Sequence, residues 1–207
     1  ANSSQKPKAV IDKISNFYET EFSNVGRSVH TLAVKATNRF EAVRDKVKQY
    51  INAKHREEII FTKGATEGIN LVASSFGKKY INKGDEILVT ELEHHSNYVP
   101  WHYLRSEKGA VIKFAQVNSD GDVEIDEIKK QITNKTKIIA ITHISNVTGA
   151  VLPITKIVDL AKEKNIPVLI DGTQGAPHSH IDMQKIGCDF YAISCHKMYG
   201  PNGLGIL

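Results

Sequence analysis

The chain has 207 residues, of which 41% are hydrophobic and 24% are charged, a balance typical of globular proteins that bury a core. The formal net charge of +4 comes from lysines that alternate with acidic residues, so neither nucleic acid nor a membrane is an expected partner. No apolar run approaches the roughly 20 residues that span a bilayer, and no signal peptide is visible.

Two helices are predicted before any strand. Apolar residues recur at helical spacing over residues 32–53, and a further helix is predicted over residues 8–22. The loop between them is polar and contains glycine. We expect residues 1–56 to form an N-terminal helical segment packed on a larger domain.

From residue 57 onward, β-rich runs alternate with amphipathic segments. Most of the β-rich runs are continuous in Val, Ile and Leu, which is typical of strands covered on both faces. The predicted strands are 58–62, 86–90, 111–117, 137–142, 167–170 and 189–194. The predicted helices are 66–81, 97–108, 125–132, 154–165 and 183–186. This order predicts an α/β domain over residues 57–207, with a mainly parallel sheet and helices on both faces.

The two ends of the sequence are expected to be truncated. Residues 204–207 are apolar and typical of the start of a strand, and residue 1 begins in a loop. We therefore expect a C-terminal small domain to be absent from this chain.

The segment 64–68, Gly-Ala-Thr-Glu-Gly, connects the first predicted strand to a helix. The backbone amides at the helix start and the hydroxyl of Thr66 would suit a phosphate. The alternative is that Thr66 simply caps the helix, and the motif on its own favours that interpretation.

Adjacent histidines, His94 and His95, follow the predicted strand 86–90. An imidazole in this place can stack on an aromatic cofactor ring, whereas adjacent histidines in general are more often surface residues. No metal site is predicted, because no spacing supplies the further ligands.

An aspartate and a lysine follow two of the apolar strands. Asp171 ends an apolar run and needs a partner there, which a pyridinium nitrogen would supply. Lys197 can form a Schiff base with an aldehyde, and Gln174 can hydrogen-bond a phenolic oxygen. Alone, Asp171 could cap a turn and Lys197 could be an ordinary surface lysine. Together they predict pyridoxal 5′-phosphate as the cofactor.

The residues around Lys197 support this prediction. Ser194 and His196 alternate with Cys195 along the expected strand end, so both would face a phosphate while the thiol faces away. Residues 200–203 are expected to form a turn. Cys195 is interpreted as a small buried thiol rather than a nucleophile. A nucleotide-binding domain is a weaker alternative, because it leaves Asp171 and Lys197 without a role.

Five segments resemble, in order and spacing, motifs of the fold-type I, class V aminotransferase family, and within it the group II cysteine desulfurases. They are residues 64–70, 93–101, 142–147, 171–174 and 194–197. The resemblance implies a transferase-like large domain that binds pyridoxal phosphate. It also implies two catalytic residues: Lys197, which forms the Schiff base, and His94, which stacks over the ring. The cofactor-binding residues that it implies are Ala65, Thr66, His94, Asn146, Asp171, Gln174, Ser194, His196 and Lys197.

The resemblance also implies an activity. Group II cysteine desulfurases convert L-cysteine to L-alanine and pass the sulfur on as a protein persulfide for iron–sulfur cluster assembly, as homodimers. Alternatives are a selenocysteine lyase, another lyase of the family, or an inactive cofactor-domain fragment. The family's persulfide cysteine and carboxylate-binding arginine are expected beyond Leu207, since neither Cys188 nor Cys195 matches that cysteine.

Cysteine usage bears on the compartment. Cys188 and Cys195 fit neither a disulfide framework nor a zinc pattern, which favours a reducing, cytoplasmic location, although the expected truncation of the N-terminus leaves an organelle open. Three positions depart from the family pattern: Asn2 replaces a small residue, Gly26 a histidine and Ser28 a glycine. These departures bear on substrate specificity.

Overall fold

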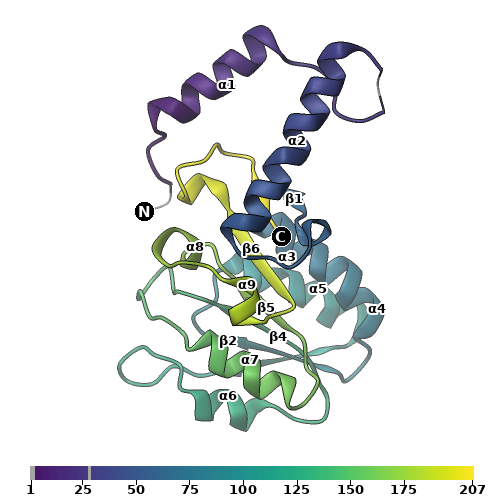
Figure 1. Ribbon diagram of the computed structural model, residues 1–207. Coiled ribbons are helices and arrows are strands. Elements are labelled where there is room, and N and C mark those ends of the chain that lie inside the picture. The colour runs from purple at the N-terminus through teal and green to yellow at the C-terminus, as the bar shows by residue number, and fades with distance from the viewer. Residues whose placement is uncertain (1–2, 28) are drawn as a thin grey trace.

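The computed structural model describes residues 3–27 and 29–207, so the departures at Asn2 and Ser28 lie outside the described residues. A seven-stranded sheet of order β1-β7-β6-β5-β4-β2-β3 forms its centre (Figure 1). The strands are β1 (Phe61–Thr62), β2 (Glu86–Thr90), β3 (Val111–Ala115), β4 (Thr136–Thr142), β5 (Val168–Asp171), β6 (Phe190–Ser194) and β7 (Gly205–Ile206). Strands β2 to β6 are parallel, and β7 is antiparallel to both of its neighbours. The prediction of a mainly parallel sheet is confirmed.

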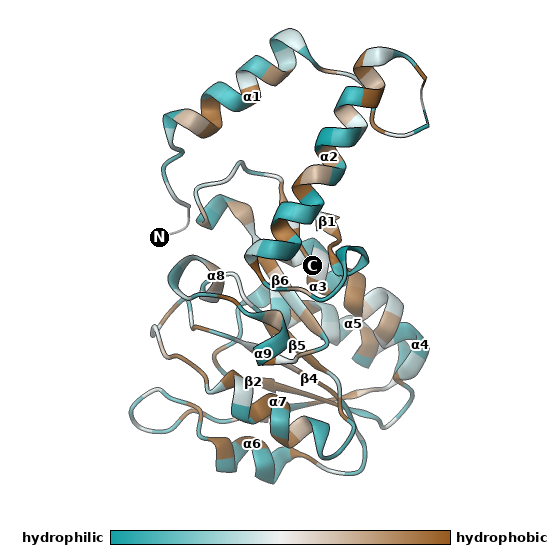
Figure 2. Cartoon of the chain, viewed as in Figure 1, coloured by the Kyte–Doolittle hydropathy of each residue, from teal (hydrophilic) through white to brown (hydrophobic). Residues whose placement is uncertain are grey.

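Helices cover both faces of the sheet because its central strands are apolar on both sides. Along β4, Ile139 and Ile141 pack into one core cluster, while Ile138 and Ala140 pack into another. Helices α6 (Ile125–Gln131), α7 (Ile154–Lys162), α8 (Gly175–His178) and α9 (Met183–Ile186) contribute to the first cluster. Helices α3 (Ala65–Val72) and α5 (Val99–Lys108) contribute to the second. In Figure 2 the strands are largely brown, whereas the outer faces of the helices are largely teal.

The N-terminal helices project from this body. Helix α1 (Lys8–Thr20) buries none of its residues and lies away from the sheet (Figure 1). Helix α2 (Thr31–Tyr50) reaches the body from its middle, where the ring centroids of Phe40 and Phe61 lie 5.1 Å apart. Among the described residues, no helix is long and apolar enough to cross a membrane.

Several boundaries differ from the sequence prediction. Residues 58–62 do not all form a strand, because Glu58 accepts hydrogen bonds from the amides of Lys54 and His55 and closes a 3₁₀ turn, η1 (Arg56–Glu58). The predicted helix 66–81 is divided by a π-helical turn, η2 (Ala73–Gly77), before α4 (Lys78–Tyr80). Helix α8, the 3₁₀ turn η3 (His95–Asn97) and the 3₁₀ turn η4 (Cys195–Lys197) were not predicted.

Sheet topology places a crevice at one edge of the sheet. The chain passes from β2 to β3 on one side and then to β4 on the other side of β2. In open parallel sheets, ligands bind outside the carboxyl ends of the strands where the direction of winding changes in this way. The loops that follow β2, β4, β5 and β6 open at this edge.

Candidate active site

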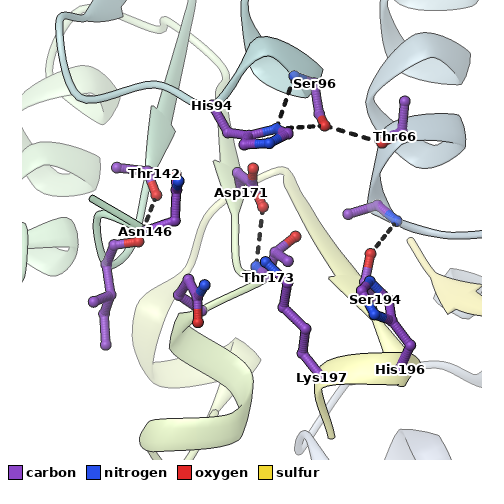
Figure 3. A pocket seen from close by; sticks show the side chains of 13 residues that line it. Thr66, His94, Ser96, Thr142, Asn146, Asp171, Thr173, Ser194, His196 and Lys197 are labelled. Atoms are coloured by element: carbon purple, nitrogen blue, oxygen red, sulfur yellow. Dashed lines mark hydrogen bonds between the residues drawn. The ribbon is translucent and has the colours of Figure 1, made fainter. Parts of the chain in front are cut away.

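A single pocket at this edge brings together every residue that the sequence predicted to contact the cofactor. Figure 3 shows Thr66, Ser96, Ser194 and His196 on one side and Asn146 on the other, with Asp171 between them. The lining residues are Ala65, Thr66, His94, Ser96, Thr142, Ile144, Asn146, Asp171, Thr173, Gln174, Ser194, His196 and Lys197. Five segments, at the carboxyl ends of β1, β2, β4, β5 and β6, thus converge on one site.

One side of the pocket is built to hold an anion. Helix α3 begins at Ala65, and the backbone N–H of Ala65 donates to Oγ of Ser194 at 2.8 Å. The Thr66 and Ser96 hydroxyls lie 3.0 Å apart. The N-cap of α3 is Gly64, a residue without a side chain, so the alternative in which Thr66 only caps the helix is wrong. Hydroxyls and the amides of a helix N-terminus are the groups that bind phosphate in such sites.

Strand β7 fixes the backbone of this anion side. A side chain at Gly205 would overlap the backbone of Gly64. Ile60 and Leu207 exchange backbone hydrogen bonds of 2.8 Å in the same region. Because glycine allows the two backbones to approach, β7 holds the turn that begins α3.

Ser96 orients the imidazole of His94. The backbone N–H of Ser96 donates to His94 Nδ1 at 3.1 Å, and the Ser96 hydroxyl lies 2.8 Å from the same nitrogen. Since Nδ1 accepts from the backbone, the proton of the neutral ring is assigned to Nε2. His95 does not line the pocket, so only the first histidine of the pair belongs to the site.

Glu93 anchors the loop that carries His94. Its Oε1 accepts the hydroxyl of Thr90 at 2.7 Å and the backbone N–H of Thr142 at 2.8 Å, and its Oε2 accepts the amide of Asn97 at 2.6 Å. Burial raises the pKa of Glu93 to about 8, with a smaller contribution from Asp171, against the lowering effect of these donors. Glu93 is therefore mainly protonated at neutral pH and ties the end of β2 to the end of β4.

Asp171 and Lys197 face the same pocket. Asp171 is 4% exposed, and Thr173 N–H donates to its Oδ1 at 2.9 Å. This bond is the turn cap that the sequence offered as an alternative, and it occupies one of the two carboxylate oxygens. No donor to Oδ2 is found among residues 3–27 and 29–207, so this oxygen is available to a group bound in the pocket.

The site residues fit pyridoxal phosphate. The anion side suits the phosphate, the free oxygen of Asp171 suits a protonated ring nitrogen, and Lys197 supplies an amine for the aldehyde. No group of three or more His, Cys, Asp or Glu side chains suited to a metal occurs in the described part of the chain.

The sequence argument for His196 was wrong in its geometry. Strand β6 ends at Ser194, and η4 follows, so His196 does not alternate with Ser194 along a strand. Both residues still line the pocket. Burial lowers the pKa of His196, and the nearby Lys197 and Lys6 lower it further. A neutral imidazole can accept or donate one hydrogen bond at each nitrogen.

Comparison with known proteins decides the family. The class-V aminotransferase family model matches residues 1–207. The chain belongs to the class-V aminotransferase family. Members of this family depend on pyridoxal phosphate, the cofactor that the site residues fit.

Class-V aminotransferases similar to this chain include named cysteine desulfurases. A cysteine desulfurase of Serratia proteamaculans is 48% identical, and a probable cysteine desulfurase of Halalkalibacterium halodurans is 46% identical, each over all 207 residues and 51% of the relative. The crystal structure of the cysteine desulfurase CsdA from Escherichia coli superposes with a TM-score of 0.90 at 38% identity, over 99% of this chain and 51% of CsdA. The chain thus spans about half the length of the curated relatives it matches.

Sequence reasoning missed four residues that line this class-V site. Ser96, Thr142, Ile144 and Thr173 belong to the pocket, although no role was assigned to them. A serine in a surface loop and a threonine at a strand end carry no distinguishing pattern. The role of Glu93 was also missed, although an acidic residue directly after an apolar strand and before a candidate catalytic histidine is a signal that could have revealed it.

Proposed function

We propose that the protein is a pyridoxal-phosphate-dependent cysteine desulfurase that converts L-cysteine to L-alanine and transfers the sulfur to a thiol. The observation that carries this proposal is the convergence of Lys197 and the half-satisfied Asp171 carboxylate in one pocket with an anion-binding side. Relatives that are 42–48% identical are named cysteine desulfurases, which supports the choice of reaction within the family.

Each site residue has a distinct task in this proposal. The bound cofactor supplies an electron sink for the electrons left at the substrate α-carbon. Lys197 removes the proton from that carbon through its Nζ. Asp171 keeps the ring nitrogen protonated by its negative charge, and His94, oriented by Ser96, lies against the ring.

The remaining pocket residues bind the polar and charged groups of the cofactor and the substrate. Thr66, Ser194, His196 and the amides at the start of α3 hold the phosphate. Gln174 would hydrogen-bond the phenolic oxygen of the cofactor. Asn146, which lies on the opposite side of the pocket from Thr66 (Figure 3), would bind near the substrate carboxylate. These assignments place the phosphate and the substrate on separate sides of Asp171.

The thiol that accepts sulfur comes from outside residues 1–207 in this proposal. Cysteine and an acceptor thiol give alanine and a persulfide, which balances without an added oxidant or reductant. Neither Cys188 nor Cys195 lines the pocket. Burial raises the pKa of Cys188 to about 12 and also raises that of Cys195, and a protonated thiol is a poor nucleophile.

The partners and the compartment follow from the same proposal. The sulfur goes to an acceptor protein for iron–sulfur cluster assembly. The protein works as a cytoplasmic homodimer in this proposal, and its two free cysteines are consistent with a reducing compartment. Val147, which is 83% exposed next to the pocket residue Asn146, is the position chosen for a charge that would disrupt a dimer near the pocket. Sedimentation of wild-type protein and of Val147→Asp tests the dimer, and a monomeric wild type would contradict it.

A trapping experiment tests the activity. Pyridoxal phosphate is added, borohydride is applied, and peptide mass spectrometry locates the pyridoxyl group. We expect it on Lys197, with loss in Lys197→Ala and retention in Lys185→Ala, a change in an exposed lysine of α9. Alanine and sulfide are then measured with L-cysteine and an added dithiol, which accepts the sulfur as a persulfide and releases it as sulfide when it closes to a disulfide. Labelling elsewhere, or alanine formation only from L-selenocysteine, would contradict the proposal.

A further inference from the structure

The segment before α1 returns to the turn that carries Lys197. Figure 1 shows the N-terminal end of the chain beside the yellow loop after β6. The backbone N–H of Ser4 donates to the carbonyl of His196 at 3.0 Å, and the Ser4 hydroxyl donates to the carbonyl of Lys197 at 2.8 Å. Residues more than 190 positions apart in sequence therefore meet at the candidate catalytic lysine. We call residues 3–6 the N-terminal strap.

A cation reinforces the strap. Lys6 Nζ donates to the carbonyl of His196 at 2.8 Å and to the Ser3 hydroxyl at 3.3 Å, and the Ser3 hydroxyl also donates to the His196 carbonyl at 3.1 Å. Lys6 is half-buried and has no ion pair with a carboxylate among residues 3–27 and 29–207. A hydrogen bond from an ammonium group is roughly twice as strong as one between neutral groups.

The turn with Lys197 needs support from outside itself. The amides of Met198 and Gly200, which follow η4, both donate to the carbonyl of Cys195. For the carbonyls of His196 and Lys197, the donors in the described part of the chain all belong to the N-terminal strap. A peptide carbonyl left without a donor in a partly buried turn costs about 1–3 kcal/mol, so the strap contributes to holding this turn.

The loop that follows the turn contains a strained residue. Tyr199 has φ of 63°, a left-handed conformation that residues other than glycine rarely adopt. Such a conformation persists only where surrounding contacts determine it. The strap binds the carbonyls on both sides of the Lys197 Cα atom, and the strained Tyr199 follows two residues later. The backbone position of Lys197 therefore depends on both.

We infer that Lys6 and Ser4 are positioning residues for Lys197: the N-terminal strap fixes the η4 backbone so that the lysine side chain enters the pocket. This inference deepens the proposed function, because it rests on Lys197 being the residue that reacts with the cofactor aldehyde. Neither Lys6 nor Ser4 lines the pocket, so they act through the turn rather than by contact with the cofactor.

Two measurements test the strap, one without the cofactor and one with it. The first is amide hydrogen exchange of the peptide spanning residues 195–200 in protein free of pyridoxal phosphate. The second is the rate of borohydride-trapped labelling of Lys197 at saturating pyridoxal phosphate. The variants are Lys6→Met, Ser4→Ala and the conservative Lys6→Arg. Lys8→Met is the control, because it removes the same charge from a lysine that pairs with Asp12 on α1 rather than with the turn.

We expect Lys6→Met to speed exchange in this peptide and to slow labelling of Lys197 about tenfold, since a small displacement of a reacting group costs one to two orders of magnitude. Ser4→Ala should have a smaller effect in the same direction, and Lys6→Arg should retain most of the labelling rate. Lys8→Met should match wild type.

The outcomes separate the inference from the proposed function. If Lys6→Met and Ser4→Ala match Lys8→Met in both measurements, the inference is overturned even though wild-type protein is labelled at Lys197. If wild-type Lys197 is not labelled at all, the proposed function fails, and the exchange measurement alone still decides whether the strap holds the turn. Unchanged far-UV circular dichroism in each variant excludes global unfolding as the cause of faster exchange.

Discussion

The phenol oxygen of Tyr191 lies 2.8 Å from Nδ1 of His143, and both side chains are buried at the end of the sheet. A side chain at Gly172 would overlap the ring of Tyr191, and one at Gly175 would overlap the imidazole of His143. The turn that carries Asp171 therefore rests directly on this pair. Burial lowers the pKa of His143, so the ring is neutral and well suited to a single hydrogen bond with the phenol.

Tyr191→Phe removes this hydrogen bond and leaves Nδ1 of His143 without a partner. We expect a loss of about 1–2 kcal/mol in the free energy of unfolding, because an unsatisfied buried group retains its desolvation cost. Urea denaturation measures the change, and Tyr103→Phe, at a position 61% exposed, is the control. A Tyr191→Phe protein as stable as the control would show that the pair does not support the turn.

Glu93→Gln should make stability less sensitive to pH. Burial raises the pKa of Glu93 from 4.5 to about 8, so the folded protein keeps a proton that the unfolded chain releases over this range. The contribution of this proton to the free energy of unfolding is fully present below about pH 4.5 and is lost as the pH rises toward 8. Glutamine does not titrate, so the variant should lack this loss, which amounts to about 4 kcal/mol between pH 5 and pH 8.5.

The control for this pH prediction is Glu163→Gln, in which an exposed carboxylate is replaced at the end of α7. Denaturant unfolding at several pH values gives the slope of stability against pH for each protein. If Glu93→Gln and wild type show the same slope, Glu93 is ionised in the folded state and the assigned protonation is wrong.

The apolar strands could be predicted because burial on both faces requires continuous runs of apolar residues in the sequence. Residues 86–90 were predicted as a strand, and β2 has these bounds. The strand-end positions of Asp171 and Lys197 followed from the same pattern, since loops at the carboxyl edge of a parallel sheet converge. The apolar runs therefore predicted both the sheet and the edge where the site lies.

The parts that sequence reasoning missed depend on polar contacts over long sequence separations. Glu93 contacts the amide of Thr142, and Ser4 contacts the carbonyl of Lys197. Serine, lysine and glutamate are common on surfaces, and no spacing distinguishes the few that satisfy a distant backbone group. Short turns such as η4 are missed for a related reason, because three residues are too few to show a period.

Gly205→Ala should disturb the anion side of the pocket. A Cβ at residue 205 would overlap the backbone of Gly64, and neither backbone can move without breaking the pairing of β7 with its neighbours. We expect a destabilisation of about 1–3 kcal/mol or more, typical of overpacking, together with weaker binding of pyridoxal phosphate. Thermal unfolding and cofactor titration measure the two effects.

Gly64→Ala is the matched control for that change, because its Cβ would meet only the Ser194 hydroxyl at 3.5 Å, an ordinary contact. It should be close to wild type in stability. Equal stability of the two alanine variants would show that the contact between β7 and the start of α3 is not close enough to exclude a side chain.

Asp171→Asn removes the negative charge while keeping an oxygen that can accept the Thr173 N–H. In the proposed site, the ring nitrogen of pyridoxal phosphate then loses its ionic partner in a buried setting, where removing one member of a charge pair costs about 2–5 kcal/mol. We expect cofactor affinity to fall on the order of 100-fold and alanine formation to fall further. Asp159→Asn, on the exposed side of α7, controls for loss of one charge. Cofactor titration and product analysis measure both effects, and an Asp171→Asn protein that binds the cofactor as tightly as the control would assign the ring nitrogen to another residue.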